Sequence, residues 1–209
     1  RLADYCYLEH DHTCALKHLE KVRVDEVNIE IAEMVHYRKA EIYYGMAEFD
    51  RAINLFYDYI EKCDANVYPK REFRDEALEF MAISFSDMGN GAQAAIDFFR
   101  RKGGKPYEDY VMYTIGMKNR VHGQYDEAIM ALKTALERFP YYKDAPLAQQ
   151  MLVECYMIKK RYDEANEARE HLVDFYSEGS QWYSKNRGEK EVIEEARKRM
   201  ATALGEEHR

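Results

Sequence analysis

Residues 123–129 read Gly-Gln-Tyr-Asp-Glu-Ala-Ile, and this short stretch decides the expected fold because it recurs along the chain. Residues 47–53 and 160–166 each carry an aromatic residue, an acid directly after it, and an alanine three residues after the aromatic. A fourth copy has Gly91 in place of the aromatic residue. The alanines of the four copies are separated by 42, 34 and 37 residues: Ala52, Ala94, Ala128 and Ala165. Periods of this length are typical of helical repeat proteins.

Each copy also has a small or hydrophobic residue twelve positions before its alanine: Ala40, Ala82, Gly116 and Val153. A small residue on one helix and an alanine on the next let two antiparallel helices approach closely. Gly89 and Gly123 stand between the two helices of their copies, where a tight bend favours glycine. Because one helix pair cannot bury both of its faces, we expect the pairs to stack on one another.

This pattern resembles the tetratricopeptide repeat family, whose helix pairs carry a small residue, tyrosine, glycine, tyrosine, alanine, phenylalanine, alanine and proline in that order. The third copy has the most matching residues: Gly116, Gly123, Tyr125, Ala128, Ala135 and Pro140. The fourth copy matches through Tyr156, Tyr162 and Ala165, but Arg169 replaces the aromatic residue. The resemblance covers about residues 26–176. It implies an all-α, right-handed α-solenoid of antiparallel helix pairs that ends in a C-terminal capping helix.

We expect one domain over residues 1–209, with a partial repeat at 1–25, four repeats at 26–176 and a capping segment at 177–209. The helical periodicity and the cap residues predict helices at 2–9, 12–23, 26–45, 49–62, 71–88, 92–101, 106–121, 125–138, 145–159, 162–176 and 189–204. The stretch between Glu178 and Arg187 leaves the repeat pattern. Its Trp182, the only tryptophan of the chain, is expected to anchor this segment on the last repeat.

The composition excludes several classes of protein. Only 10 glycines and 4 prolines occur in 209 residues, which is too few for the turns of an ordinary β protein. With 46% hydrophobic and 33% charged residues, the chain is too apolar for disorder and too charged for a membrane span. A net charge of −8 opposes binding to nucleic acid or anionic lipid. Because the chain begins at Arg1 without methionine, we expect a missing upstream segment, which is a signal peptide, a lipid anchor or more protein.

Cys6, His10, His12 and Cys14 form the densest group of chemically active side chains, and His18 follows one helical turn after Cys14. Three interpretations stay open. The cysteines belong to the core while the histidines lie on the surface, or Cys6 and Cys14 form a disulfide across a helical hairpin. In the third interpretation, two thiolates and two imidazoles hold a tetrahedral zinc ion.

The sequence predicts no enzyme, no catalytic residue and no cofactor. Residues 103–106, Gly-Gly-Lys-Pro, lack the spacing of a phosphate-binding loop. No pair of carboxylates stands out as an acid and base with opposed environments.

The family resemblance implies that the first helix of each pair lines a concave groove for a peptide or partner protein. The expected lining residues are Tyr37, Arg38, Glu41, Tyr44, Glu79, Ile83, Ser86, Tyr110, Tyr113, Met117, Arg120, Gln150, Met151, Glu154 and Met157. Tyrosine offers a large contact area, and methionine adapts to different shapes.

We therefore expect a non-enzymatic scaffold or adaptor that binds a protein segment, with no nucleic acid partner and no membrane insertion. The repeats and the tail at 176–183 resemble bacterial envelope proteins of this family, which favours a periplasmic or envelope location over the cytoplasm. Two alternatives are a self-associating scaffold and a metal-binding or enzyme-accessory module that uses Cys6, His10, His12 and Cys14.

Overall fold

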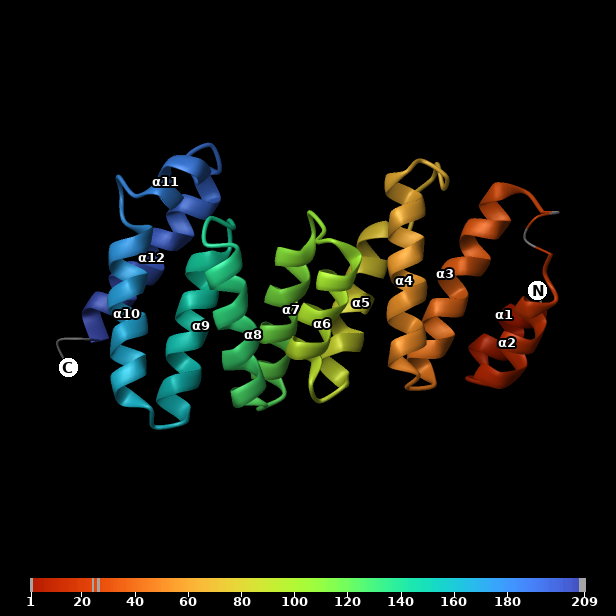
Figure 1. Cartoon of the computed structure of the whole chain (residues 1–209), viewed down its shortest axis with the longest axis horizontal. Coiled ribbons are helices and arrows are strands. Elements are labelled where there is room, and N and C mark those ends of the chain that lie inside the picture. The colour runs from red at the N-terminus through yellow and green to blue at the C-terminus, as the bar shows by residue number, and fades with distance from the viewer. Residues whose placement is uncertain (1, 24, 26, 207–209) are drawn as a thin grey trace. The chain divides into compact units, whose positions relative to one another are not determined.

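The structure is a computed structural model that describes residues 2–23, 25 and 27–206. All regular secondary structure among these residues is helical (Figure 1). The helices are α1 (Leu2–Leu8), α2 (His12–Glu20), α3 (Ile29–Gly45), α4 (Phe49–Asp64), α5 (Arg74–Asp87), α6 (Gly91–Lys102), α7 (Glu108–Val121), α8 (Tyr125–Arg138), α9 (Ala145–Ile158), α10 (Tyr162–Tyr176), α11 (Gln181–Asn186) and α12 (Lys190–Glu206).

The predicted all-α fold of helix pairs is confirmed. Each of the eleven predicted helices is present, with ends that differ by at most three residues. The prediction missed α11, which begins after Ser180, whose side chain accepts a hydrogen bond from the amide of Tyr183. The chain divides into two compact units, Arg1–Gly91 and Ala92–Arg209. A single domain spanning the whole chain stays a prediction.

In the first unit, α1 pairs with α2 and α3 pairs with α4, while α5 packs on α4 (Figure 1). Ala40 and Ala52 are fully buried, as expected for residues that let α3 and α4 approach closely. Aromatic rings fill the space around this contact, and the ring of Tyr37 stacks on Phe73 with centroids 4.5 Å apart. A smaller core of Cys6, Ala15, Leu19, Val35 and Ile42 holds the N-terminal hairpin to α3.

In the second unit, α7 pairs with α8 and α9 pairs with α10 (Figure 1). A side chain at Gly116 would place its Cβ 2.7 Å from Cγ of Leu132, so the spacing of α7 and α8 depends on this glycine. Beyond α10, the short helix α11 and the long helix α12 close the unit. Trp182 lies at the centre of their core, fully buried, and donates a hydrogen bond of 2.8 Å to the carbonyl oxygen of Tyr142.

The second repeat departs from the predicted register. Ala95 is fully buried, whereas Ala94, which aligned with the other repeat alanines, is only half-buried. The bend before α6 explains the difference in part, because a Cβ at Gly91 would lie 1.9 Å from the carbonyl oxygen of Phe85. This close approach leaves no room for the aromatic residue that the other copies carry at this position.

None of the described helices is both long and apolar enough to cross a lipid bilayer.

Candidate functional site

The groove residues expected from sequence lie on α3 and α5 in the first unit, and on α7 and α9 in the second. Three of them are buried in the structure. Tyr37 is 3% exposed and Tyr113 is 5% exposed, so both rings belong to the packing between helices. Ser86 is also buried. These three residues are therefore buried rather than exposed on a groove, because a tyrosine or serine at helical spacing fits the interior as well as a surface; their part in a groove stays a prediction.

On the first unit, the remaining expected residues are partly engaged with their neighbours. Arg38 forms an ion pair with Glu41 at 2.7 Å, and its guanidinium lies 4.3 Å from the ring centroid of Tyr7. The Tyr44 hydroxyl donates to Asp87 at 3.1 Å. Burial raises the pKa of the Glu41 carboxyl above its usual range, although Arg38 opposes this effect. Ile83 is half-buried, and Glu79 is exposed.

On the second unit, the structure joins three expected residues into one polar network. Arg120 of α7 forms an ion pair with Glu154 of α9. Glu154 also accepts a hydrogen bond of 3.2 Å from the side-chain amide of Gln150, one turn earlier on α9. Both charged side chains keep about a third of their surface exposed, 32% for Arg120 and 36% for Glu154, so solvent and a partner can reach them.

Sequence reasoning missed a further member of this network. Arg199 of α12 donates a hydrogen bond to the side-chain oxygen of Gln150. Its guanidinium also lies 3.7 Å from Glu195, one helical turn earlier on α12. The packing of α12 against α9 and α10 brings Arg199 to this place. The capping helix is therefore part of the candidate site.

Two hollows follow the contact between α9 and α12. The larger, of about 170 Å³, is lined by residues that include Leu147 of α9 and Val192 of α12, with Glu195 and Arg199 at its edge. Arg199 also lines the smaller hollow, together with Gln150, Glu154 and Arg169. Arg169 is the residue that departs from the family pattern in α10. Its guanidinium donates to Asn166 at 2.8 Å.

Methionines from α7 and α9 accompany the polar network. Met117 lies one turn before Arg120, and Met151 directly follows Gln150. Both methionines are half-buried. Met157, one turn after Glu154, is 41% exposed. Tyr110, at the start of α7, is half-buried. We name the surface formed by Met117, Arg120, Gln150, Met151, Glu154, Met157 and Arg199 the unit 2 surface.

A buried polar cluster in the first unit has a structural role. Glu33, 3% exposed, accepts hydrogen bonds from the Tyr59 hydroxyl at 2.9 Å and from the Glu72 amide at 3.3 Å. His36 lies 3.0 Å from the Tyr68 hydroxyl. Burial, with the nearby charge of Lys62, lowers the pKa of His36 to about 4. These contacts hold the connection between α4 and α5 against α3, and the sequence pattern gave no sign of them.

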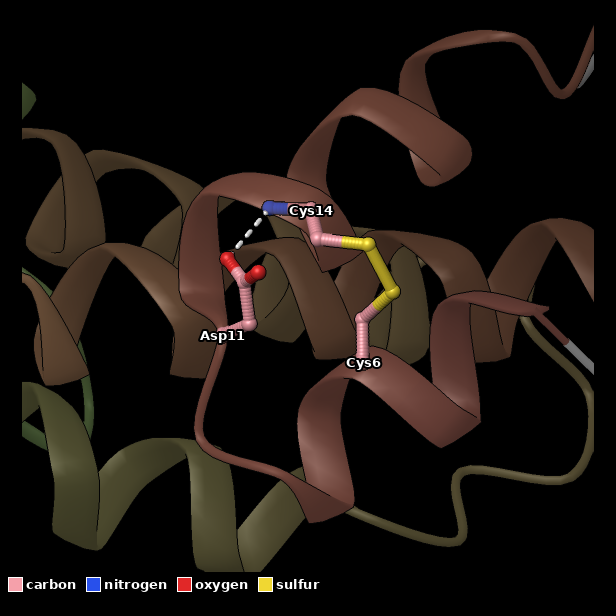
Figure 2. Close-up of a disulfide and its surroundings, with 3 residues drawn as sticks. All are labelled: Cys6, Asp11 and Cys14. Carbon is pink, nitrogen blue, oxygen red and sulfur yellow. Dashed lines mark hydrogen bonds between the residues drawn. A yellow bond between two sulfur atoms is a disulfide. The ribbon is translucent and has the colours of Figure 1, made fainter.

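The cysteines of the N-terminal hairpin form a disulfide in the structure, the second of the three interpretations. Cys6 of α1 and Cys14 of α2 have Cα atoms 5.6 Å apart (Figure 2). Asp11 caps α2 by accepting a hydrogen bond of 2.9 Å from the Cys14 amide (Figure 2). The metal set of the third interpretation, Cys6, His10, His12 and Cys14, is not the group that the fold brings together. Among the described residues, the cysteine sulfurs lie close to a nitrogen of His18 instead.

The fold and the unit 2 surface define a helical repeat protein with a partly exposed polar and methionine-rich face. Residues 122–183, which include α8, α9 and α10, match the family model described as tetratricopeptide repeat. Over this stretch the chain is therefore similar to the tetratricopeptide repeat family, in agreement with the sequence resemblance. Tetratricopeptide repeats generally mediate protein–protein interactions. A comparison with curated proteins finds no match to this chain.

Proposed function

We propose that this protein is a non-enzymatic scaffold that holds a segment of a partner protein on the unit 2 surface. The observation that carries the proposal is the hydrogen-bonded network that links Arg120, Glu154, Gln150 and Arg199 across α7, α9 and α12. Three helices thus place charged and amide groups next to one another, and the side chains of Arg120 and Glu154 remain partly exposed to solvent.

The composition of the surface indicates the chemistry of the partner. Methionine side chains repack around apolar groups of different shape, so Met117, Met151 and Met157 suit the apolar residues of a bound segment. The guanidinium groups of Arg120 and Arg199 can bind carboxylates or backbone carbonyls through two parallel hydrogen bonds. An amphipathic segment with apolar and acidic residues fits these two features together.

The remaining expected residues of the groove belong to the same proposal. Tyr110 would extend the unit 2 surface along α7, whereas Arg38, Glu41, Tyr44, Glu79 and Ile83 would offer a contact surface on the first unit by itself. Their polar groups already interact with neighbours in several cases, so we assign the larger energetic share to the unit 2 surface.

The proposal is tested by comparing two variants of the full chain in affinity capture with quantitative mass spectrometry. The first, Met117→Ala with Arg120→Ala and Met157→Ala, removes the centre of the unit 2 surface. The second, Met130→Ala, is a matched control because Met130 lies on α8 and is 42% exposed, nearly the same as Met157. Partners of the wild type should persist with the control and be lost with the triple variant. Equal capture by all three proteins would contradict the proposal.

Self-association is a second candidate function, favoured by one observation. Leu2, Tyr5 and Leu8 follow one another at three-residue spacing on α1, and all three are more than 60% exposed. Such an apolar face suits contact with a second copy of the chain. Light scattering over a range of concentrations tests this candidate. Leu8→Asp should dissociate an assembly, whereas a monomer at every concentration would contradict self-association.

For the location of the scaffold, we propose the bacterial envelope, with a role in assembly or secretion there. The Cys6–Cys14 disulfide supports this part, because disulfides persist in oxidising compartments such as the periplasm and are rare in the cytosol. Trapping thiols with an alkylating agent in acid-quenched cells is the test. Cys6 and Cys14 should be protected until a reductant is added, and their alkylation without reductant would contradict the location.

A further inference from the structure

The N-terminal hairpin brings three metal-ligating side chains together from two helices. The sulfurs of Cys6 and Cys14 and an imidazole nitrogen of His18 all lie within 4.8 Å of one another. Cys14 and His18 are four residues apart on α2, so their side chains stand on the same face of that helix. Cys6 reaches the same point from α1.

The hairpin has supports besides the disulfide. Ala15 and Leu19 of α2 pack in a core with Val35 and Ile42 of α3, and Asp11 caps the start of α2. These contacts do not involve the sulfur–sulfur bond. We therefore expect the two helices to keep Cys6, Cys14 and His18 near one another after the disulfide is reduced.

We propose that the reduced hairpin is a binding site for a thiophilic divalent ion such as Zn²⁺, with Cys6, Cys14 and His18 as its ligands. Zinc binds cysteine sulfur at about 2.3 Å and histidine nitrogen at about 2.0–2.1 Å, so ligand atoms in a tetrahedral site lie roughly 3.5–4 Å apart. The observed grouping within 4.8 Å needs only small side-chain movements to reach this spacing. A water molecule or a partner's side chain would complete the four ligands.

The disulfide and the metal site exclude each other. A thiol reductant such as glutathione supplies two electrons and two protons to the Cys6–Cys14 bond and is itself oxidised to a disulfide. The ion then displaces the two thiol protons as it forms two metal–sulfur bonds, and its oxidation state does not change. The hairpin would thus carry the disulfide in an oxidising compartment and the metal in a reducing one.

Cobalt tests the proposal, because Co²⁺ replaces zinc and its thiolate complexes absorb strongly. The full chain, reduced with a phosphine under anaerobic conditions, should bind one Co²⁺ and show sulfur-to-cobalt charge-transfer absorption. Zn²⁺ should displace the cobalt, and the oxidised chain should show no such band. A reduced chain without the charge-transfer band would overturn the proposal.

Three variants assign the ligands. Cys6→Ser with Cys14→Ser keeps the two buried free cysteines, Cys63 and Cys155, and should lose the band. His18→Gln should weaken Zn²⁺ binding by more than the roughly 10–100-fold that loss of an outer-shell partner costs. His10→Asn is the matched control, because His10 is exposed with φ of 57°, a conformation that asparagine tolerates, and it should bind as the wild type does. A band that survives in the double variant, or an unchanged affinity in His18→Gln, would show that other residues bind the ion.

Discussion

Gly116 shows how the absence of one side chain sets the distance between two helices. A Cβ at this position would lie 2.7 Å from Cγ of Leu132 and 3.3 Å from its backbone nitrogen. Real Cβ atoms do not approach carbon atoms so closely, so α7 and α8 would have to separate or Leu132 would have to move.

Gly116→Ala is therefore expected to destabilise the protein. Overpacking costs about 1–3 kcal/mol, which exceeds the gain of about 1 kcal/mol that alanine brings to a helix interior. The free energy of unfolding from urea denaturation measures the difference. In a Leu132→Ala background the clash with the side chain is gone, so the same substitution should become neutral or stabilising. A destabilisation of equal size in both backgrounds would contradict this explanation.

His36 makes stability depend on pH. In the unfolded chain its pKa is near 6.5, and burial together with Lys62 lowers it to about 4 in the folded protein. Between pH 6.5 and pH 4, the His36 side chain therefore stays neutral in the folded protein, whereas it takes up a proton in the unfolded chain. The contribution of neutral His36 to the free energy of unfolding is complete above pH 6.5 and is lost as the pH falls toward 4.

The expected loss between pH 7 and pH 4 from this residue is at most about 3 kcal/mol. Carboxylates also titrate in this range, so the informative quantity is the difference between the wild type and His36→Gln, which cannot titrate. The free energy of unfolding should fall more steeply with acid in the wild type. Parallel pH profiles of the two proteins would contradict the assignment.

At the scale of elements, the C-terminal helices α11 and α12 depend on one tryptophan. Trp182 packs with Tyr176 of α10, whose ring centroid is 5.5 Å away, and with Ile193 and Ala196 of α12. Its indole N–H bonds to the backbone of Tyr142, before α9. The six residues of α11 could not form a stable helix without such contacts.

Trp182→Ala should cost about 3–5 kcal/mol, because it leaves a large cavity in this core. Trp182→Phe keeps most of the ring and removes one of two hydrogen bonds to the Tyr142 carbonyl oxygen, which still accepts from the Ala145 amide at 3.0 Å. Its cost should therefore be smaller, about 0.5–1.5 kcal/mol. Thermal unfolding followed by far-ultraviolet circular dichroism ranks the two variants. Equal melting temperatures for the wild type and Trp182→Ala would show that the tryptophan does not anchor these helices.

At the scale of the whole molecule, the chain consists of two compact units that each have buried residues of their own. In repeat proteins, stability is close to a sum over repeats and their nearest neighbours. A fragment that keeps complete helix pairs can therefore fold without the rest of the chain.

Residues 89–209, which keep the complete pairs α7–α8 and α9–α10 together with α6, α11 and α12, should fold on their own. Circular dichroism should show a helical fragment with a cooperative thermal transition, and the fluorescence of Trp182 should be that of a buried indole. A fragment without a cooperative transition, or with solvent-exposed tryptophan emission, would contradict independence of the second unit.

The sequence by itself determined the helices and their pairing, because both depend on residues that are near one another in the chain. The spacing of apolar residues, the small residues at Gly116 and Ala128, and the bends at Gly89 and Gly123 are local signals. They predicted the repeat family and every helix except α11.

Only the tertiary structure decided which side chains are exposed, because burial depends on residues that are distant in sequence. Tyr37 and Tyr113 have the residue type of a binding surface, yet neighbouring helices cover them. Arg199 donates a hydrogen bond to Gln150, which lies 49 residues earlier in the chain, and no local sequence pattern indicates that contact. The chemical state of Cys6 and Cys14 was also decided by the tertiary structure. The sequence allowed core thiols, a disulfide or a metal site, and the hairpin selected the disulfide and placed His18 beside it.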